Sequence, residues 1–245
     1  MLEVRQLRKH FGGVHAVDGV DFDVAPGECV ALIGPNGAGK STTFACIAGQ
    51  YPVTSGQVRW QGVSLEALSP AARLQQGVAR TFQVAQVFEA LTALQNVQLA
   101  LAARRDAVSA FMPLDAQQAD DALALLEQTG LADLASHDAL SLPYGAKKRL
   151  ELALALAAKP QLLLLDEPAA GLAEAERGAL MALVKRLAAG GMAVLYTEHN
   201  MDAVAQVADR VLVLIEGKLA AQGSFDDISR DAIVRKRYLG EGAHA

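Results

Sequence analysis

The sequence predicts an α/β fold built on a parallel sheet with helices on both faces. Short apolar runs typical of buried strands alternate along the chain with longer segments whose apolar residues recur at helical spacing. Such alternation indicates parallel strands, because each crossover between them needs room for a helix. The apolar run at 161–165 is typical of a strand in the middle of such a sheet, where both faces are buried.

The first sixty residues predict three strands and one helix. The first strand alternates apolar and polar residues and ends at a turn formed by Pro26 and Gly27. The second is apolar and runs into a glycine-rich loop that a helix follows. The strands are expected at 14–24, 28–33 and 57–60, and the helix at 41–48.

The character of the chain changes between 92 and 158. Alanine, leucine and charged residues recur there at helical spacing, which predicts a helical insertion within the α/β chain. One helix is expected at 115–130, with its stop at Gly130, and another at 147–157.

The last third predicts a return to alternating strands and helices. Strands are expected at 161–165, 192–197 and 210–215, and helices at 175–189 and 201–208. Residues 225–245 are expected to form a polar tail with one helical segment.

Composition and charge exclude several classes of protein. Hydrophobic residues make up 52% of the chain, enough for a core, and the net charge of −5 provides no basic field for a general nucleic-acid role. The two cysteines, Cys29 and Cys46, have no metal-binding spacing and indicate a reducing cytosol. We find no signal peptide and no apolar run approaching the roughly 18 residues of a membrane span. Contact with a membrane would therefore require a partner.

The glycine-rich segment between an expected strand and an expected helix predicts a phosphate-binding loop. Residues 34–41 read Gly-Pro-Asn-Gly-Ala-Gly-Lys-Ser, which fits the pattern G-x-x-x-x-G-K-[ST]. Glycines let backbone N–H groups turn toward phosphate oxygens, and the helix dipole favours the same charge. Lys40 would lie between the β- and γ-phosphates, and the Ser41 hydroxyl would bind Mg²⁺. A chance lysine after a glycine-rich turn is the simpler alternative, and the flanking elements argue against it.

Two carboxylates follow the apolar strand at 161–165. Open α/β sheets place their ligand chemistry at the carboxyl ends of strands. Asp166 would hold Mg²⁺ through water, and Glu167 would activate the attacking water as a general base. Solvated acids at a strand end are the alternative, which the neighbouring phosphate loop disfavours.

Five further features occur in a fixed order along the chain: an aromatic residue 29 positions before Lys40, a glutamine where the helical block begins, a leucine-led segment, two acids followed by proline, and a histidine after a strand. They are Phe11, Gln83, Leu142-Pro143-Tyr144-Gly145-Ala146, Asp166-Glu167-Pro168 and His199. Taken singly, a phenylalanine is usually a core residue and a lone histidine is usually structural. Taken together, they make nearly the whole chain similar to the ATP-binding cassette ATPases.

The resemblance implies a P-loop NTPase (RecA-like) core with an N-terminal antiparallel β subdomain and an inserted helical subdomain. The core would comprise 1–83 and 159–225, the helical subdomain 84–158 and the C-terminal tail 226–245, within one nucleotide-binding domain of 1–245. Motion would reach a membrane partner through the junction at 83–88.

The resemblance also implies ATP and Mg²⁺ as cofactors and assigns the site. Glu167, His199 and Gln83 would be catalytic, and Ser41, Gln83 and Asp166 would hold the metal. Nucleotide would contact Phe11, Gly34, Asn36, Gly37, Ala38, Gly39, Lys40, Ser41, Thr42, Tyr144 and Gly145.

Two copies would be needed, since the helix start near Gly145 would face the γ-phosphate held by a second ATPase subunit, identical or different. Further partners would be integral membrane permease subunits and, indirectly, a substrate-binding protein, with no nucleic acid. The chain would lie at the cytoplasmic face of the inner or plasma membrane and be soluble when isolated.

The chain departs from the family pattern at several positions. Pro143 replaces the signature serine, Tyr144 the first glycine and Ala146 the glutamine. Ala173 stands where aspartate is usual, and Leu154 where arginine is common. These changes predict that the isolated chain is a poor ATPase.

Several stretches resemble the branch that takes up branched-chain amino acids, where related systems carry urea, other amino acids or small amides. The most telling is the Tyr144-Gly145 signature, followed by Phe11-Gly12-Gly13. Two alternatives stay open: a lipopolysaccharide-export ATPase, which has a similar Tyr-Leu-Gly-Glu tail, and a soluble cassette ATPase acting in DNA repair or on ribosomes. The second is disfavoured by the acidic balance and the lack of a heptad run.

Overall fold

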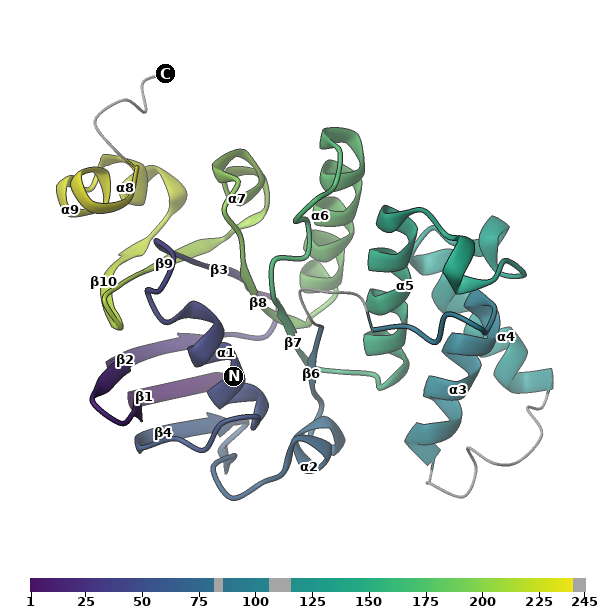
Figure 1. The fold of residues 1–245 in the computed structure, drawn as a ribbon, viewed down its shortest axis with the longest axis horizontal. Coiled ribbons are helices and arrows are strands. Elements are labelled where there is room, and N and C mark those ends of the chain that lie inside the picture. Colours follow the sequence, from purple (N-terminus) through teal and green to yellow (C-terminus); the bar gives the residue numbers. More distant parts are fainter. Residues whose placement is uncertain (82–85, 106–115, 240–245) are drawn as a thin grey trace.

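The computed structural model describes residues 1–81, 86–105 and 116–239. Within these residues, two sheets lie next to each other and a helical region extends from one side of them (Figure 1). The first sheet has four strands in the order β2-β1-β4-β5. The second has six strands in the order β10-β9-β3-β8-β7-β6.

The four-stranded sheet is antiparallel and comes from the N-terminal part of the chain. Its strand at 14–24 was predicted, but its first strand was not, because charged residues and three register shifts obscure the alternation of that segment. The residues Leu2, Val4 and Leu7 of this first strand are nevertheless fully buried. The strands are β1 (Leu2–Phe11), β2 (Val14–Val24), β4 (Ser55–Trp60) and β5 (Val63–Ser64).

The six-stranded sheet is parallel except for its edge strand β10, which pairs antiparallel with β9. The expected strands are present at the predicted places. The short strand β6 and the polar edge strand β10 were not predicted, because neither has a run of apolar residues long enough to be recognised. The strands are β3 (Cys29–Ile33), β6 (Val78–Arg80), β7 (Leu162–Leu165), β8 (Ala193–Thr197), β9 (Arg210–Ile215) and β10 (Lys218–Gly223).

Both faces of the parallel sheet are covered, as the sequence predicts. Residues Val30 and Leu32 of β3 pack toward α1 and the four-stranded sheet. Their neighbours Cys29, Ala31 and Ile33 point to the opposite face, toward α6 and α7. The helices on these two faces are α1 (Lys40–Ala48), α2 (Pro70–Gln75), α6 (Glu174–Ala189) and α7 (Met201–Val207).

The helical region has its own apolar cluster, to which α5 contributes Leu150 and Ala153. The other side of α5 contributes Leu152 and Leu156 to the core of the parallel sheet, so α5 joins the two regions. Gly130, with φ +70°, ends its helix as predicted. The elements are α3 (Ala93–Arg105), α4 (Ala116–Gln128), α5 (Tyr144–Ala157) and the 3₁₀ turns η2 (Ala132–Leu134) and η3 (Ala139–Ser141).

The expected start of α5 at Lys147 is wrong. The helix begins three residues earlier, at Tyr144, with Pro143 as its N-cap. Because proline lacks an N–H group and has a fixed φ, it is compatible with a helix start. The segment with the family signature therefore forms the first turn of α5 rather than a loop before it.

The C-terminal segment holds more structure than the one helical segment expected. Ser224 forms a capping box with Asp227, and the Asp231 side chain accepts two backbone N–H groups. These caps define α8 (Phe225–Arg230), α9 (Ala232–Val234) and the π-helical turn η4 (Arg235–Leu239). In the described part of the chain, no helix combines the length and the apolar character that crossing a bilayer would need.

The C-terminal end of α1 is capped by a buried cation. The Arg73 guanidinium, 3% exposed, donates hydrogen bonds of 2.6 Å to the carbonyls of Cys46 and Ile47. Burial lowers the pKa of Arg73. Its charge complements the negative end of the helix whose positive end is the phosphate loop.

Replacement of Arg73 by methionine is therefore expected to lower the free energy of unfolding by about 1–3 kcal/mol, because the last carbonyls of α1 lose buried donors. Urea unfolding followed by circular dichroism measures this change. The matched control is Arg59→Met on the exposed side of β4, which should stay close to the unaltered chain. Equal midpoints for the two variants would contradict the capping role.

Candidate functional site

The phosphate loop is held by close contact with two neighbouring backbones. A Cβ at Gly34 would lie 2.1 Å from the carbonyl oxygen of Leu214, and one at Gly39 would lie 2.3 Å from that of Ala16. Both glycines also have positive φ, +147° and +102°. Two glycines of the motif are thus required by packing as well as by the turn itself.

Lys40 lies inside this loop. Its Nζ donates to the carbonyls of Gly34 at 2.7 Å and Pro35 at 3.0 Å. Burial lowers the pKa of Lys40, while the negative charges of Glu167 and Asp166 act in the opposite direction. The loop therefore has its cation and the two carboxylates of the motif within electrostatic reach of one another.

The other predicted residues of the loop lie along its rim. Asn36, Gly37 and Ser41 are exposed, and Thr42 is partly buried. Ala38 is buried, and its carbonyl accepts the N–H of Gly217. The exposed members leave backbone and hydroxyl groups accessible to a ligand at the start of α1.

Thr197, at the end of β8, connects the Asp166 carboxylate to the backbone of Glu167. Its hydroxyl donates to Asp166 Oδ1 at 2.9 Å and accepts the backbone N–H of Glu167, also at 2.9 Å. Glu167 has φ +48°, a conformation unusual for a residue with a side chain. The sequence analysis did not identify Thr197, since a threonine at a strand end carries no motif.

Arg80, at the end of β6, holds the other oxygen of Asp166. Its Nη2 donates to Asp166 Oδ2 at 2.8 Å, and its Nη1 donates to Gln50 after α1. The Arg80 and Asp166 side chains are only 11% and 10% exposed. The sequence analysis gave Arg80 no role.

His199 and Glu167 are brought together as neighbours. The ring Nε2 of His199 lies 2.7 Å from Glu167 Oε1. The preceding residue, Glu198, accepts the backbone N–H groups of His199 and Asn200 with Oε1 and so fixes this turn. The predicted base and the predicted γ-phosphate contact therefore share one hydrogen bond.

Phe11 is 43% exposed, so it is not the core residue that was the alternative. Its ring packs edge-on against Tyr51 with centroids 5.3 Å apart, and Lys9 Nζ lies 4.8 Å from the Phe11 centroid. Tyr51 carries no motif and was not identified from the sequence. The pair presents an aromatic surface that a flat base could stack on.

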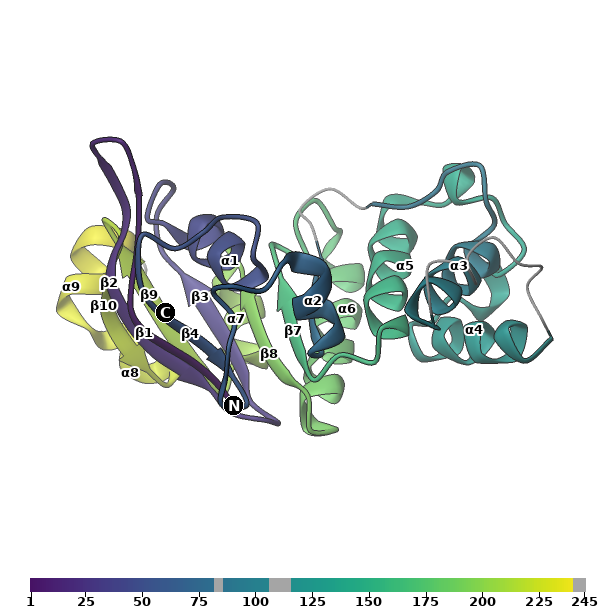
Figure 2. The ribbon, with the colours of Figure 1, turned by 90° about the horizontal axis from the view of Figure 1, so that it is seen from below.

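Tyr144 and Gly145 are not near the phosphate loop of the same chain. They begin α5, and in both orientations β7 and β8 lie between α5 and α1 (Figures 1 and 2). Tyr144 is 45% exposed, and a Cβ at Gly145 would meet the carboxylate of Glu176 at 2.6 Å. Gln83 lies outside the described residues.

Four of the five departures from the family pattern fall on two helix starts, while Leu154 lies inside α5. Pro143 is the N-cap of α5 and Ala173 the N-cap of α6, and neither side chain caps its helix. Serine and aspartate, the residues usual at these positions, both accept N–H groups at helix starts.

The C-terminal segment also reaches the phosphate loop. The phenol of Tyr238 lies near the backbone N–H of Gly34, and its ring packs on the core below. Burial raises the pKa of Tyr238, while the nearby N–H of Gly34 acts in the opposite direction. The sequence analysis treated this segment as a polar tail and missed the contact.

His10, His15 and Asp18 form a second group of possible metal ligands, with ligand atoms within 4.8 Å of one another. The two imidazoles stack face to face at 3.8 Å and 13°, so one ion cannot lie in the planes of both rings. Asp18 is paired with Arg8 and Lys218, each at 3.3 Å. We interpret this group as a structural contact across the β1–β2 hairpin.

Comparison with known proteins agrees with this site. A profile of the ABC transporter family matches residues 17–170, which include the phosphate loop, the helical region and the carboxylate pair. The chain belongs to the ABC transporter family. It is an ATP-binding subunit and ATPase of this family.

The ABC subunit is 36% identical to the high-affinity branched-chain amino acid transport ATP-binding proteins BraF of Pseudomonas aeruginosa and LivG of Escherichia coli, over 98% of each chain. It is 34% identical to the lipopolysaccharide export system ATP-binding protein LptB of Escherichia coli, over 98% of this chain and 97% of LptB.

Solved cassettes share the fold. The ADP conformation of MJ1267, an ATP-binding cassette of an ABC transporter, superimposes with a TM-score of 0.88 and 29% identity, over 98% of this chain and 99% of MJ1267. The dimeric MJ0796 cassette bound to ADP and Pi gives 0.79 and 25%, over 92% and 99%. The predicted P-loop core is thereby confirmed.

Lys40→Ala is expected to lower the affinity for ATP at least about tenfold, because the remaining backbone donors supply no full charge beside the phosphates. Isothermal titration of ATP measures the loss, with Lys236→Ala on the exposed part of η4 as control. An unchanged titration would remove Lys40 from the nucleotide site.

Proposed function

We propose that this ABC subunit binds ATP with Mg²⁺, hydrolyses it within a closed pair of subunits, and thereby powers uptake of branched-chain or related amino acids, urea or small amides. The observation that carries the proposal is the 36% identity to BraF and LivG over 98% of each chain. The cargo itself would be bound by partner proteins, so the residues of this chain do not choose among these compounds.

Binding begins at the phosphate loop. Its backbone N–H groups and the dipole of α1 attract the phosphates, and Lys40 exchanges the carbonyls of Gly34 and Pro35 for phosphate oxygens. Phe11 stacks on the adenine, because its exposed ring is accessible to a base. The remaining contacts are those assigned to Gly34, Asn36, Gly37, Ala38, Gly39, Ser41 and Thr42.

Mg²⁺ fits the donor set around the γ-phosphate. The Ser41 hydroxyl and the Asp166 carboxylate are the hard oxygen donors that this ion prefers, and Gln83 would add a third. When bound, the ion neutralises charge that develops on the transferred phosphoryl group. Thr197 fixes the rotamer of Asp166 and so the direction from which that carboxylate acts.

Glu167 is the proposed general base. Its 2.7 Å contact with His199 places both side chains at the edge of the sheet from which the phosphate loop departs. His199 would move to the γ-phosphate when ATP binds. Gln83 would then help to orient the attacking water.

A second ATPase subunit would complete the site. The first N–H groups of α5, at Tyr144 and Gly145, lie apart from their own phosphate loop and are suited to bind the γ-phosphate held by a neighbour. The dimeric MJ0796 cassette supports such pairing. Hydrolysis removes the charge that both halves bind, and the pair reopens. The second subunit could be identical or a related chain.

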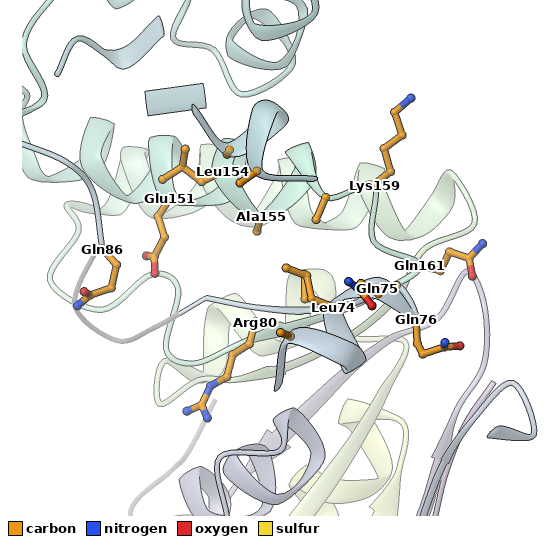
Figure 3. Close-up of a pocket in the computed structure, with 16 residues that line it drawn as sticks. Leu74, Gln75, Gln76, Arg80, Gln86, Glu151, Leu154, Ala155, Lys159 and Gln161 are labelled. Atoms are coloured by element: carbon orange, nitrogen blue, oxygen red, sulfur yellow. The ribbon is translucent and has the colours of Figure 1, made fainter. Parts of the chain in front are cut away.

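A cavity between the core and the helical region is the proposed docking place of the membrane subunits (Figure 3). It measures about 710 Å³ and lies between α2, β6, α3 and α5. Its apolar members include Leu74, which is 43% exposed, and Ala155. The cavity also reaches Gln86, in the junction that the sequence analysis expected to transmit motion.

With this arrangement, the chain would lie at the cytoplasmic face of the inner or plasma membrane, attached through its partners. Lipopolysaccharide export is the second candidate, favoured by the 34% identity to LptB. The cargo-binding partner distinguishes the two, because uptake requires a protein that binds amino acids or amides.

Affinity purification of the tagged chain from native membranes, with mass spectrometry, is the direct experiment. We expect permease subunits of an uptake system, and amino-acid-dependent ATPase activity once these subunits and their binding protein are reconstituted. Leu74→Asp should abolish the co-purification, and Ile233→Asp, an equally exposed apolar residue on α9, should not. Recovery of lipopolysaccharide-export subunits, or of ribosomes, would replace the proposed function.

Glu167→Gln is expected to keep ATP binding, stabilise the ATP-bound dimer and lower turnover about 10²–10⁴-fold, the range of general-base catalysis. Light scattering after size exclusion measures the dimer, and phosphate release measures turnover. Glu174→Gln at the exposed start of α6 is the control. Normal turnover in Glu167→Gln would show that another group is the base.

Ala173→Asp should raise the free energy of unfolding by about 0.5–2 kcal/mol, since a carboxylate would cap the start of α6. Thermal unfolding of the nucleotide-free protein tests this effect.

The unaltered chain, which lacks a side-chain cap at Ala173 and has proline in place of the signature serine at position 143, should hydrolyse ATP slowly by itself. Brisk turnover by the isolated protein would contradict the expected slow hydrolysis.

A further inference from the structure

Arg80 is the one residue described above that both contacts Asp166 and lines the proposed docking cavity. It ends β6, from which its side chain reaches Asp166 at 2.8 Å and Gln50 beyond α1. It also lines the cavity, on the core side opposite Glu151 and Ala155 of α5 (Figure 3). Neither the motifs of the phosphate site nor the family resemblance gives this arginine a function.

The pair between Arg80 and Asp166 is nearly dry. The two side chains are 11% and 10% exposed, so water screens their attraction poorly. The Arg80 guanidinium occupies Asp166 Oδ2, while the Thr197 hydroxyl occupies Oδ1. Both oxygens of the carboxylate assigned to the metal therefore accept hydrogen bonds from protein donors.

A divalent cation at Asp166 would meet the positive charge of Arg80 at short range. Two cations next to one carboxylate repel each other strongly in a site with little water. Arg80 also lines the cavity of about 710 Å³, and a side chain released from Asp166 would turn toward that space. Loss of the Arg80 contact would leave Asp166 held by Thr197, which is neutral and does not oppose a metal.

We propose that Arg80 is a positioning residue that holds Asp166 in the metal-free state and competes with Mg²⁺ for it, so that metal arrival releases Arg80 toward the docking cavity. This inference rests on the proposed function, since it takes Asp166 as a metal-binding carboxylate of a nucleotide site. According to this proposal, the contact between Arg80 and Asp166 is present without Mg²⁺ and is lost when Mg²⁺ binds.

The test compares ADP affinity in Mg²⁺ with ADP affinity in EDTA, by isothermal titration of the full chain. ADP is not hydrolysed, so the measurement does not depend on the catalytic residues. The ratio of the two affinities reports how well the site accepts the metal. Arg80→Gln should raise this ratio about 5- to 10-fold, because a cation that repels Mg²⁺ is gone while Thr197 still orients Asp166.

Two further variants separate charge from structure. Arg80→Lys keeps the positive charge without the planar fork, and its ratio should stay within about twofold of the unaltered chain. Arg59→Gln, on the exposed side of β4, should leave the ratio unchanged. In EDTA, the midpoint of thermal unfolding should be lower for Arg80→Gln than for the unaltered chain. Addition of Mg²⁺ with ADP should raise the midpoint of Arg80→Gln by more than it raises that of the unaltered chain.

The outcomes distinguish this inference from the proposed function. If Arg80→Gln binds ADP with the same or a smaller ratio than the unaltered chain, or if Arg80→Lys shows the same rise, competition with the metal is wrong and the proposed function is untouched. If the unaltered chain binds no ADP in either condition, the proposed function fails and this inference fails with it.

Discussion

The structure depends on the close approach of the phosphate loop to two other backbones. Gly34 lies against the carbonyl of Leu214 in β9, and Gly39 lies against that of Ala16 in β2. A methyl group at either position would push the loop off the sheet. The contact thus joins the parallel sheet, the antiparallel sheet and the N-terminus of α1 at one point, and the ligand chemistry is arranged around it.

From that point, the charged groups are placed by the ends of parallel strands. The strands β3, β6, β7 and β8 end at the same edge, so the loop, Arg80, Asp166 and Thr197 converge there. The charged and polar side chains near this edge have protein partners: Lys40 binds loop carbonyls, His199 contacts Glu167, and Arg80 and Thr197 share Asp166. A nucleotide with its metal would have to exchange these partners, which makes the site responsive to ligand.

The helical region adds the features that would depend on partners. Because α5 packs on both apolar clusters, a shift of that helix changes its relation to the core and to the cavity together. Its first turn carries the signature residues, and β7 and β8 lie between α5 and α1, which follows the phosphate loop (Figures 1 and 2). The two proposed halves of a nucleotide site therefore lie apart within one chain.

The sequence by itself determined the α/β class, most of the buried strands, the phosphate loop and the carboxylate pair, because each of these depends on local patterns of apolar residues or fixed spacing. It could not determine β1, β6 or β10, whose pairing depends on neighbours rather than on their own composition. Only the tertiary structure decided the partners of Asp166, the exposure of Phe11 with Tyr51, and the contact of Tyr238 with Gly34. These pairs join residues far apart in the chain, and the spacing of residues along the sequence does not indicate which strand ends lie side by side.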